Sequence, residues 1–582
     1  MANTTIDPTI LKRAQAWLND SNIDNETKAR ISQLIENDPA ELAESFYCDL
    51  EFGTGGLRGI MGDGTNRMNK YTVGMATQGL ANYLKTVFAG KGEIKIAIAH
   101  DSRNNSSYFA KTSAEVLSAN GITVYLFEYL RPTPELSFAV RYLHCQSGIV
   151  ITASHNPKEY NGYKVYWDDG AQLVPPHDKN VILEVQKIAS IAEVNFVGDS
   201  SKIHMIGEEI DKEFLRVSKS YSLAPEVIAP QKDMKIVFTP LHGTGITLVP
   251  QALRNYGFEN IHIVEEQAVS DGNFPTIVSP NPEEKAAMLM ALDKARAINA
   301  DLVLATDPDA DRIGVGVKDV DGNYILLNGN QTAALLTYYL IKQWQAKGKL
   351  KGNEYIVKTI VTSELISDIA KSAGVEYFDC LTGFKWIAEV IRNLEGEKTF
   401  IGGGEESYGF MIGDFVRDKD AVTACCIFAE CAAWAASKGK SLYELLLDIY
   451  LEYGVYKENL VNVVKKGMSG QAEIKAMMEG FRSNPPKEIA GSQVILMNDY
   501  QLRKATDLKS GIVKPIELPK SDVLQFFLAD GTKISMRPSG TEPKIKFYFS
   551  VRADLDAVAN FKKVETKLDK RIDEIIVSMG LR

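Results

Sequence analysis

The sequence predicts an α/β protein of four domains, in which three similar mixed α/β sheet domains are followed by a C-terminal α+β domain. The chain has 582 residues, and at roughly 100 to 200 residues per domain this length suggests about three to five domains. Apolar residues make up 45% and charged residues 24% of the chain, which is the balance of an ordinary globular protein and excludes collagenous and largely disordered classes.

A threefold internal repeat predicts the three α/β domains. Each copy is an apolar strand-like run, a helical stretch, a glycine and a second strand-like run. The first runs begin EIKIAIAHDSR at 93, MKIVFTPLHGTG at 234 and EYIVKTIVTS at 354, and the glycines are Gly121, Gly257 and Gly374. A glycine at this point suits the left-handed residue that ends a helix. Alternating strands and helices of this length indicate parallel α/β layers.

The ends of the chain have different patterns. Asp7 and Pro8 begin a predicted helix, and apolar residues follow at helical spacing; we expect this amphipathic extension to pack against its own protein rather than against a membrane. From about residue 452 onward the pattern is that of antiparallel strands closed by a C-terminal helix. The predicted units are an N-terminal helical extension (1–50), domain 1 with a serine loop (51–206), domain 2 with an acidic loop (207–321), domain 3 with a GEESYG loop (322–450) and domain 4 with an RPSGTEPK loop (451–582).

Charge and cysteine usage narrow the function classes. Lys and Arg number 65 against 75 Asp and Glu, so the net charge gives no case for nucleic-acid binding. The six cysteines form no CxxC pair or disulfide-like framework. The start of the chain lacks the apolar core of a signal peptide, and no run of 18 apolar residues occurs. We therefore expect a cytoplasmic protein with no membrane partner.

The first candidate loop follows an apolar strand and reads TASHNP. The strand at 148–152 leads to Ser154, where strands of α/β sheets deliver side chains to ligand crevices. A serine must be activated to act as a nucleophile or phosphate carrier, and the nearby bases are His155, Lys164 and His100. An Asn-Pro turn with a capping serine is the alternative structural interpretation.

The second candidate loop, DPDADR, follows the apolar run 302–305. Asp307, Asp309 and Asp311 stand at alternate positions and can converge on one hard cation. An EF-hand is excluded, because Arg312 stands where it needs glycine and Lys318 where it needs glutamate. Three acids after a buried strand are costly without a cation, so we expect Mg²⁺ with a coordination position open to a phosphate oxygen.

The third and fourth loops complete the set. GGGEESYG offers Glu405, Glu406, Ser407 and Tyr408 between glycines, which suits sugar hydroxyls, although on this loop alone a charged exposed turn is the favoured interpretation. RPSGTEPK offers a guanidinium, two hydroxyls, flexible backbone and an ammonium, which suits a phosphate better than a simple hairpin turn. The residues of this phosphate grip are Arg537, Ser539, Gly540, Thr541 and Lys544. Together the four loops indicate phosphoryl transfer on a phosphorylated sugar.

With these four motifs in this order, the chain resembles the α-D-phosphohexomutase superfamily. The likeness runs from FGTGGLRG at 52–59 to RPSGTEPK at 537–544, and GEESYG and GFKWI are similar to its phosphoglucomutase and phosphopentomutase branch. The resemblance implies four domains around a central cleft and an isomerase that acts as an intramolecular phosphotransferase. Its substrates would be glucose 1-phosphate and glucose 6-phosphate, and its cofactors Mg²⁺ and glucose 1,6-bisphosphate as primer.

The resemblance also implies roles for single residues. Ser154 would carry the phosphoryl group and share Mg²⁺ with Asp307, Asp309 and Asp311. Lys164 would be the general acid/base, supported by His155 and Arg58, and Arg312 would face the same charge. The implied substrate contacts are Arg312, Gly383, Lys385, Glu405, Ser407, Arg537, Ser539, Gly540, Thr541 and Lys544. Some family members have a histidine in the loop where Phe384 and Lys385 stand here, so Lys385 is a candidate sugar or phosphate contact.

Alternatives stay open on the sequence. The same mechanism could serve a phosphopentomutase or a phosphomannomutase. A phosphatase with Asp307 as nucleophile would make Ser154 unnecessary, because an Asp-x-Asp after a strand can itself accept a phosphoryl group. A catalytically silent sugar-phosphate sensor is a third reading, which the complete set of loops argues against. Small sugar phosphates are the expected partners, and the protein would be a monomer or a homodimer.

Overall fold

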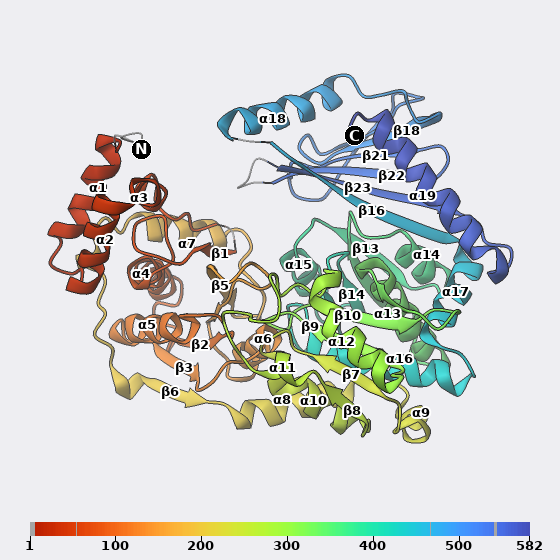
Figure 1. Cartoon of the computed structure of the whole chain (residues 1–582), viewed down its shortest axis with the longest axis horizontal. Helices are drawn as coiled ribbons and strands as arrows, with labels where there is room; N and C mark the ends of the chain where they lie inside the picture. Colours follow the sequence, from red (N-terminus) through yellow and green to blue (C-terminus); the bar gives the residue numbers. More distant parts are fainter. Residues whose placement is uncertain (1–5, 54, 466, 540–543) are drawn as a thin grey trace.

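Four β-sheets follow one another along the chain in a computed structural model, which describes residues 6–53, 55–465, 467–539 and 544–582. Figure 1 shows the first sheet domain on the left, the second in the lower centre, the third on the right and the C-terminal sheet across the top. Three sheets are mixed and the fourth is antiparallel. The predicted fold class is therefore confirmed.

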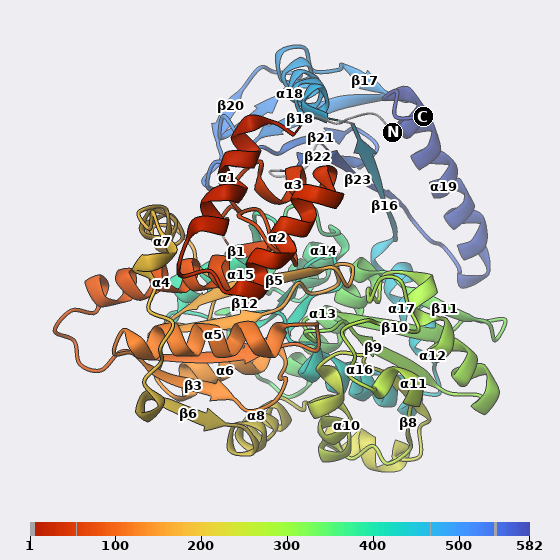
Figure 2. The ribbon, with the colours of Figure 1, turned by 60° about the vertical axis from the view of Figure 1, so that its left-hand side comes forward.

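The N-terminal helices cover one side of domain 1 (Figure 2). They are α1 (Pro8–Asn19), α2 (Asn25–Asn37) and α3 (Pro39–Phe46). The carboxylate of Asp7 accepts a hydrogen bond from Thr9 N at 2.7 Å and so caps α1. Trp17 lies edge-on to Phe46 and to Tyr71 of α4 (Lys70–Val87), with ring centres 5.7 and 5.4 Å apart. The expected packing of this extension against its own protein is thus what the structure has.

Domain 1 is a six-stranded sheet of order β1-β5-β4-β2-β3-β6. Along β2, Ile96 and Ile98 face α4 and α5, whereas Ala97 and Ala99 face α6 on the other side, which is the two-residue alternation of a strand between two helical layers. The strands are β1 (Gly56–Ile60), β2 (Lys95–His100), β3 (Thr123–Phe127), β4 (Ser147–Ile151), β5 (Tyr160–Trp167) and β6 (Ile203–Ile206). The further helices are α5 (Ser106–Ala119), α6 (Thr133–Tyr142) and α7 (His177–Gln186).

Domain 2 is a five-stranded sheet of order β11-β10-β9-β7-β8. Its strands are β7 (Ile236–Thr239), β8 (Ile261–Ile263), β9 (Leu302–Thr306), β10 (Ile313–Lys318) and β11 (Tyr324–Leu327), and its helices are α8 (Glu208–Ser220), α9 (Pro225–Ile228), α10 (Gly245–Tyr256), α11 (Glu265–Ala268) and α12 (Lys285–Ile298). The predicted boundary at 321 falls in the turn before β11. β11 pairs antiparallel with β10, because the turn at 319–323 closes a hairpin, and the last strand of this sheet ends at Leu327.

Domain 3 is a four-stranded sheet of order β13-β12-β14-β15. Its strands are β12 (Glu354–Thr359), β13 (Glu376–Cys380), β14 (Thr399–Gly404) and β15 (Phe410–Ile412), and its helices are α13 (Gly329–Ala346), α14 (Leu365–Ser372), α15 (Phe384–Leu394), α16 (Ala421–Ser437) and α17 (Leu442–Tyr453). In the described part of the chain no single helix is long and apolar enough to span a membrane, and α16 with α17 meets that test only as a pair bent by 81°. The three repeat glycines, Gly121, Gly257 and Gly374, have φ of 80°, 115° and 69°, as the repeat predicts.

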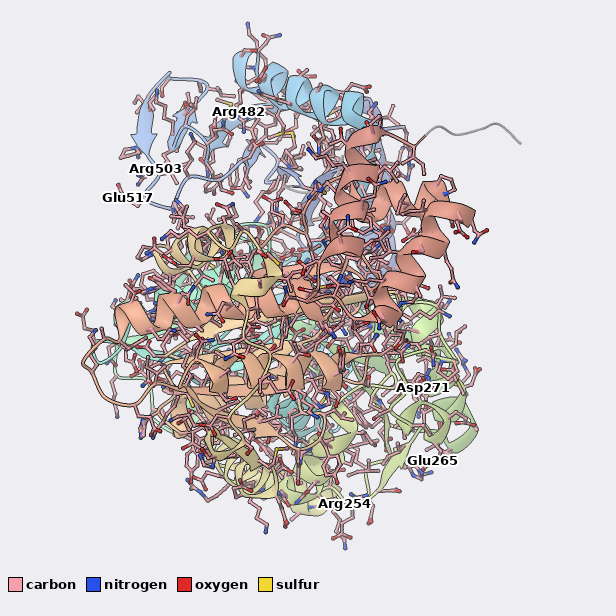
Figure 3. All side chains as sticks on the ribbon, turned by 90° about the vertical axis from the view of Figure 1, so that its left-hand side faces the viewer. Arg254, Glu265, Asp271, Arg482, Arg503 and Glu517 are labelled. Atoms are coloured by element: carbon pink, nitrogen blue, oxygen red, sulfur yellow. The ribbon has the colours of Figure 1, made fainter. Side chains whose placement is uncertain are left out.

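Domain 4 is an antiparallel sheet of order β16-β23-β22-β21-β18-β19-β20, with β17 paired to β18. Its strands are β16 (Val455–Val464), β17 (Glu488–Ile489), β18 (Ser492–Asp499), β19 (Lys504–Asp507), β20 (Val513–Pro515), β21 (Leu524–Leu528), β22 (Lys533–Pro538) and β23 (Lys544–Ala553), and its long helices are α18 (Gly467–Ser483) and α19 (Phe561–Ser578). In Figure 3 the labelled Arg482, Arg503 and Glu517 mark this domain at the top, and Arg254, Glu265 and Asp271 mark domain 2 at the bottom.

Candidate active site

The serine loop and the acidic loop meet although 153 residues separate them. Ser154 follows β4, and the acidic loop follows β9, so both loops leave the carboxyl ends of central strands. The hydroxyl of Ser154 donates a hydrogen bond to Oδ2 of Asp307 at 2.7 Å. Ser154 has φ +51° and is only 4% exposed. A strained, buried serine against a carboxylate indicates a built site rather than a capped turn.

The three aspartates of the acidic loop form one cluster. Their ligand atoms lie within 4.8 Å of one another, and all three side chains are buried. Oδ1 of Asp309 and Oδ1 of Asp311 are buried and accept no hydrogen bond. Burial and the two neighbouring carboxylates raise the pKa of Asp307 well above its usual value. Buried carboxylate oxygens without donors fit a hard divalent cation, so the residues at this site suit the predicted metal.

Lys164 reaches the same cluster from β5. Its Nζ lies 2.7 Å from Oδ2 of Asp309 and 3.2 Å from Oδ2 of Asp311. Burial lowers the pKa of Lys164, but the charges of Asp309 and Asp311 outweigh it and the net shift is upward. The ammonium form is therefore favoured, and Lys164 holds a proton beside the serine loop.

His155 and Arg58 line the same pocket as Ser154. Nδ1 of His155 is 3.2 Å from the Ser154 hydroxyl. Burial, together with the positive charges of Arg312 and Arg58, holds the pKa of His155 well below its usual value, so the imidazole is neutral. Arg58 stands on β1, which pairs antiparallel with β5 so that Gly56 lies opposite Lys164. A Cβ at Gly56 would meet Tyr163 O at 1.7 Å, which explains why this part of the FGTGGLRG motif needs glycine.

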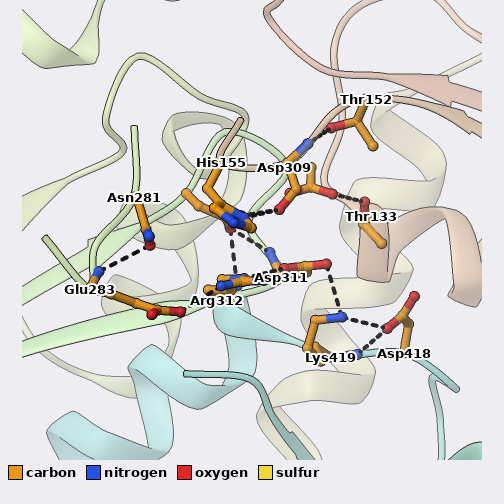
Figure 4. A network of polar contacts seen from close by, with 12 residues as sticks. Thr133, Thr152, His155, Asn281, Glu283, Asp309, Asp311, Arg312, Asp418 and Lys419 are labelled. Atoms are coloured by element: carbon orange, nitrogen blue, oxygen red, sulfur yellow. Dashed lines mark hydrogen bonds and ion pairs between the residues drawn. The ribbon is translucent and has the colours of Figure 1, made fainter. Parts of the chain in front are cut away.

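The structure adds Lys419 and Asp418 to the site (Figure 4). Nζ of Lys419 lies 3.1 Å from Oδ2 of Asp311 and 3.3 Å from Oδ1 of Asp418. Oδ2 of Asp418 accepts hydrogen bonds from the Tyr166 hydroxyl at 2.7 Å and from Gln172 Nε2 at 2.8 Å. These residues have no assigned role in the sequence analysis. The run RDKD at 417–420 could have pointed to them, because it lies directly before an apolar helix. Charged residues in such a place are buried only if they are paired.

The two glutamates of the GEESYG loop contact different segments of domain 3. Glu405 is 8% exposed, and its Oε1 accepts a hydrogen bond from Gly383 N at 2.8 Å. Oε2 of Glu406 instead accepts from the hydroxyls of Thr359 and Thr362, both at 3.2 Å. Glu405 thus faces the pocket described below, and Glu406 ties the loop to the end of β12.

Two of the predicted contacts on domains 2 and 3 have protein partners. Arg312 donates to Oε1 of Glu283 at 2.6 Å and lines the pocket. Lys385 does not line it, and its Nζ lies 3.8 Å from Oδ2 of Asp178 in α7. In this arrangement the ammonium of Lys385 is paired with Asp178 of domain 1, and its contact with substrate stays a prediction. Gly383 and Phe384 form the wall at this loop instead.

The phosphate loop of domain 4 joins β22 to β23. Arg537 lies opposite Lys546 in the antiparallel register, and Ser539 N donates to Lys544 O at 2.8 Å. Gly540 and Thr541 lie outside the described residues. The pKa of Lys546 is lowered, mainly by burial and also by the positive charge of Arg537. The negative charges of Glu406 and Glu283 offset only part of this shift. Lys546 therefore lies within electrostatic reach of Glu406 of domain 3 and Glu283 of domain 2.

One pocket of about 320 Å³ joins the loops of the first three domains. It is lined by Gly55, Gly56, Leu57, Arg58, Thr152, Ser154, His155, Lys164, Gln172, Asp311, Arg312, Gly383, Phe384, Glu405 and Lys419. Four of these side chains are cationic and three are a serine, a histidine and a glutamine. The mixture suits a small anionic ligand that also carries hydroxyls.

Four family models match the chain in order. They are the Phosphoglucomutase/phosphomannomutase alpha/beta/alpha domains I, II and III and the C-terminal domain, over residues 49–192, 216–322, 328–453 and 486–568. A phosphoglucomutase of Staphylococcus epidermidis (strain RP62A) is 39% identical over 524 residues, 89% of this chain and 94% of the relative. One of Staphylococcus aureus (strain MRSA252) is also 39% identical over 524 residues, with 89% and 93% covered.

Solved structures share the fold. Parafusin of Paramecium, an exocytosis-sensitive phosphoprotein and phosphoglucomutase in its open form, has a TM-score of 0.67 at 18% identity, with 92% of this chain and 96% of that chain covered. A phosphoglucomutase/phosphomannomutase family protein of Burkholderia thailandensis has a TM-score of 0.62 at 17% identity, with 90% and 96% covered. On the four matched domains and the two close relatives, the chain belongs to the phosphoglucomutase/phosphomannomutase family of phosphohexomutases.

Proposed function

We propose that this enzyme is a Mg²⁺-dependent phosphoglucomutase, which interconverts glucose 1-phosphate and glucose 6-phosphate through a phosphoserine at Ser154 and bound glucose 1,6-bisphosphate. The observation that carries the proposal is the contact of the Ser154 hydroxyl with Asp307 at 2.7 Å, in a pocket shared with Lys164 and Glu405. The Staphylococcus relatives at 39% identity are phosphoglucomutases, which supports glucose as the sugar.

Asp307, Asp309 and Asp311 would hold Mg²⁺ together with an oxygen of phosphorylated Ser154. The buried carboxylate oxygens that accept no hydrogen bond support this assignment. Bound Mg²⁺ neutralises negative charge on the transferring phosphoryl group. Glucose 1,6-bisphosphate would phosphorylate Ser154 and so prime the enzyme.

In the first half-reaction the P–O bond to Ser154 Oγ breaks and a new P–O bond forms to the free hydroxyl of the sugar monophosphate. The proton of that hydroxyl is transferred to Ser154 Oγ, which becomes a free hydroxyl group again. Lys164 is the group that relays this proton, because its raised pKa keeps a proton on Nζ beside the serine loop. The second half-reaction reverses these steps after the bisphosphate has turned over and presents its other phosphate.

The remaining residues bind and orient the substrate. Neutral His155 contacts the Ser154 hydroxyl. Arg58 and Arg312 bind the negatively charged phosphoryl group during its transfer. Glu405 and Ser407 bind sugar hydroxyls. The distal phosphate is held by Arg537, Ser539, Gly540, Thr541 and Lys544. A cytoplasmic location and a monomeric or homodimeric state belong to the same proposal.

The test compares kcat/KM for glucose 1-phosphate, mannose 1-phosphate and ribose 1-phosphate, with Mg²⁺ and the matching bisphosphate present. A clear preference for glucose 1-phosphate is expected. A preference for ribose 1-phosphate would move the enzyme to the phosphopentomutases, and one for mannose 1-phosphate would make it a phosphomannomutase.

The phosphoenzyme separates this mechanism from an aspartyl phosphatase. Incubation with glucose 1,6-bisphosphate is expected to give an acid-stable phosphoprotein that is absent in Ser154→Ala. An acid-labile acyl phosphate that persists in Ser154→Ala would make Asp307 the nucleophile and overturn the mutase mechanism.

A further inference from the structure

A buried arginine contacts the backbone of the serine loop and does not line the pocket. Arg103 follows β2 and is 3% exposed. Its Nη1 donates hydrogen bonds to Pro157 O at 2.8 Å and Tyr160 O at 3.0 Å. Its Nη2 donates to Ser154 O at 2.6 Å and also to Asn156 O. One guanidinium therefore binds four carbonyl oxygens of the segment that carries Ser154.

The serine loop needs such a partner. Four carbonyl dipoles that point at one place repel one another unless a positive charge lies between them. Ser154 has φ +51°, a left-handed conformation that is strained for a non-glycine residue. The backbone N of Ser154 donates to Thr152 Oγ1 at 2.8 Å, and its hydroxyl contacts Asp307 and His155. Arg103 is the group that binds the backbone carbonyls of the loop.

Arg103 is itself fixed from two sides. Oδ1 of Asp101 accepts from Arg103 N at 2.9 Å, and Oδ2 of Asp101 lies 3.4 Å from Nε. On the other side, the guanidinium carbon lies 5.1 Å from the ring centre of Phe274, a residue of domain 2. The neighbouring Asn104 donates to Asn273 at 3.0 Å. The guanidinium is therefore held between domain 1 and the domain that carries the acidic loop.

We propose that Arg103 is a positioning residue for phosphoryl transfer, which fixes the Ser154 loop relative to the acidic loop of domain 2. This inference rests on the proposed mutase function. Arg103 does not line the pocket, so it acts through Ser154 and not on the substrate. A displacement of about 1 Å from the reactive geometry can cost roughly 100-fold in rate, whereas substrate binding by the other loops stays intact.

The number of carbonyl oxygens that accept hydrogen bonds here explains why the residue is an arginine and not a lysine. A guanidinium offers five N–H donors in a fixed plane, but an ammonium offers three around one point. A lysine at this position would keep the positive charge but could donate hydrogen bonds to only some of the four carbonyl oxygens. Arg103→Lys is therefore expected to be intermediate between the wild type and Arg103→Met.

The experiment measures kcat and KM for glucose 1-phosphate, and separately the rate at which glucose 1,6-bisphosphate phosphorylates Ser154, followed by intact mass. Arg67→Met is the matched control, because Arg67 is 4% exposed and binds Glu41 and Glu44 O, away from the pocket. Arg103→Met is expected to lower kcat and the phosphorylation rate about 100-fold while KM stays within about threefold. Arg67→Met is expected to lower the melting temperature without this loss.

Several outcomes separate the possibilities. Wild-type kcat in Arg103→Met, or a rise in KM alone, would overturn the positioning role. If Arg103→Met does not fold, Arg103→Lys decides: a fall in kcat at constant KM supports the role, and wild-type kcat overturns it. A wild-type enzyme that never accepts phosphate on Ser154 would instead refute the proposed function on which the inference rests.

Discussion

Thr133 gives the sharpest test of the predicted metal site. Its hydroxyl donates a hydrogen bond to Oδ2 of Asp309 at 2.9 Å, and its backbone N donates to Asp309 O, also at 2.9 Å. Both side chains have no exposed surface. Thr133 is the first residue of α6 in domain 1, so this pair joins domain 1 to the acidic loop of domain 2.

Thr133→Val removes the hydroxyl and keeps the shape and the backbone bond. A hydrogen bond to a charged group contributes about 1.5 to 3 kcal/mol, and a lost partner of a metal ligand typically costs about 10- to 100-fold in metal affinity. We therefore expect the Mg²⁺ dissociation constant of Thr133→Val to rise about 10- to 100-fold.

The assay is a calorimetric Mg²⁺ titration without substrate, together with the Mg²⁺ concentration at half-maximal activity. Thr133→Ser keeps the hydroxyl and is the control, with Mg²⁺ affinity close to wild type. Unchanged Mg²⁺ affinity in Thr133→Val would refute the reasoning, because the hydroxyl would then have no part in orienting Asp309.

Three further predictions follow from other parts of the site and the fold. Asp309→Ala is expected to lower kcat by at least about 100-fold, and an unchanged rate would remove Asp309 from the metal site. Glu405→Gln keeps the shape of the side chain but not its charge, so kcat/KM for glucose 1-phosphate should fall about 10- to 100-fold, with wild-type kcat/KM as the contrary result. Burial raises the pKa of Glu458 from 4.5 to about 7, so the native state keeps a proton that the unfolded chain releases and stability is lost as pH rises through this range. The melting temperature should therefore fall more between about pH 5 and pH 8 in the wild type than in Glu458→Gln; equal slopes would contradict this pKa.

Much of the fold follows from local patterns. The three repeat glycines adopt positive φ because a helix that turns into a strand needs a left-handed residue there. The tail after residue 452 is antiparallel, as its short strands and turns indicate. The pairing of β11 with β10 was not predicted, because strand pairing is not visible in the local pattern of residues.

The candidate site was only partly accessible to sequence reasoning. Asp307, Asp309 and Asp311 converge, and a spacing of two residues in a short loop is enough to predict that. The ion pair of Lys385 with Asp178 was not predicted, because Asp178 lies on another domain. Lys419 was missed because Asp311, one of its two ion-pair partners, lies on domain 2 and becomes a neighbour only when domains 2 and 3 pack together.

The sequence by itself determined the fold class, the family and the identity of the four loops, because strand periodicity, turn glycines and motif spacing act within a few residues. Only the tertiary structure decided that the Ser154 hydroxyl contacts Asp307 and that Glu405 and Glu406 accept hydrogen bonds from different segments. It also decided that Arg103 binds the backbone of the serine loop. These contacts join segments far apart in the chain or turn neighbouring side chains in opposite directions. They depend on how whole domains pack, and packing is a property of shapes and orientations that no local pattern of residues contains.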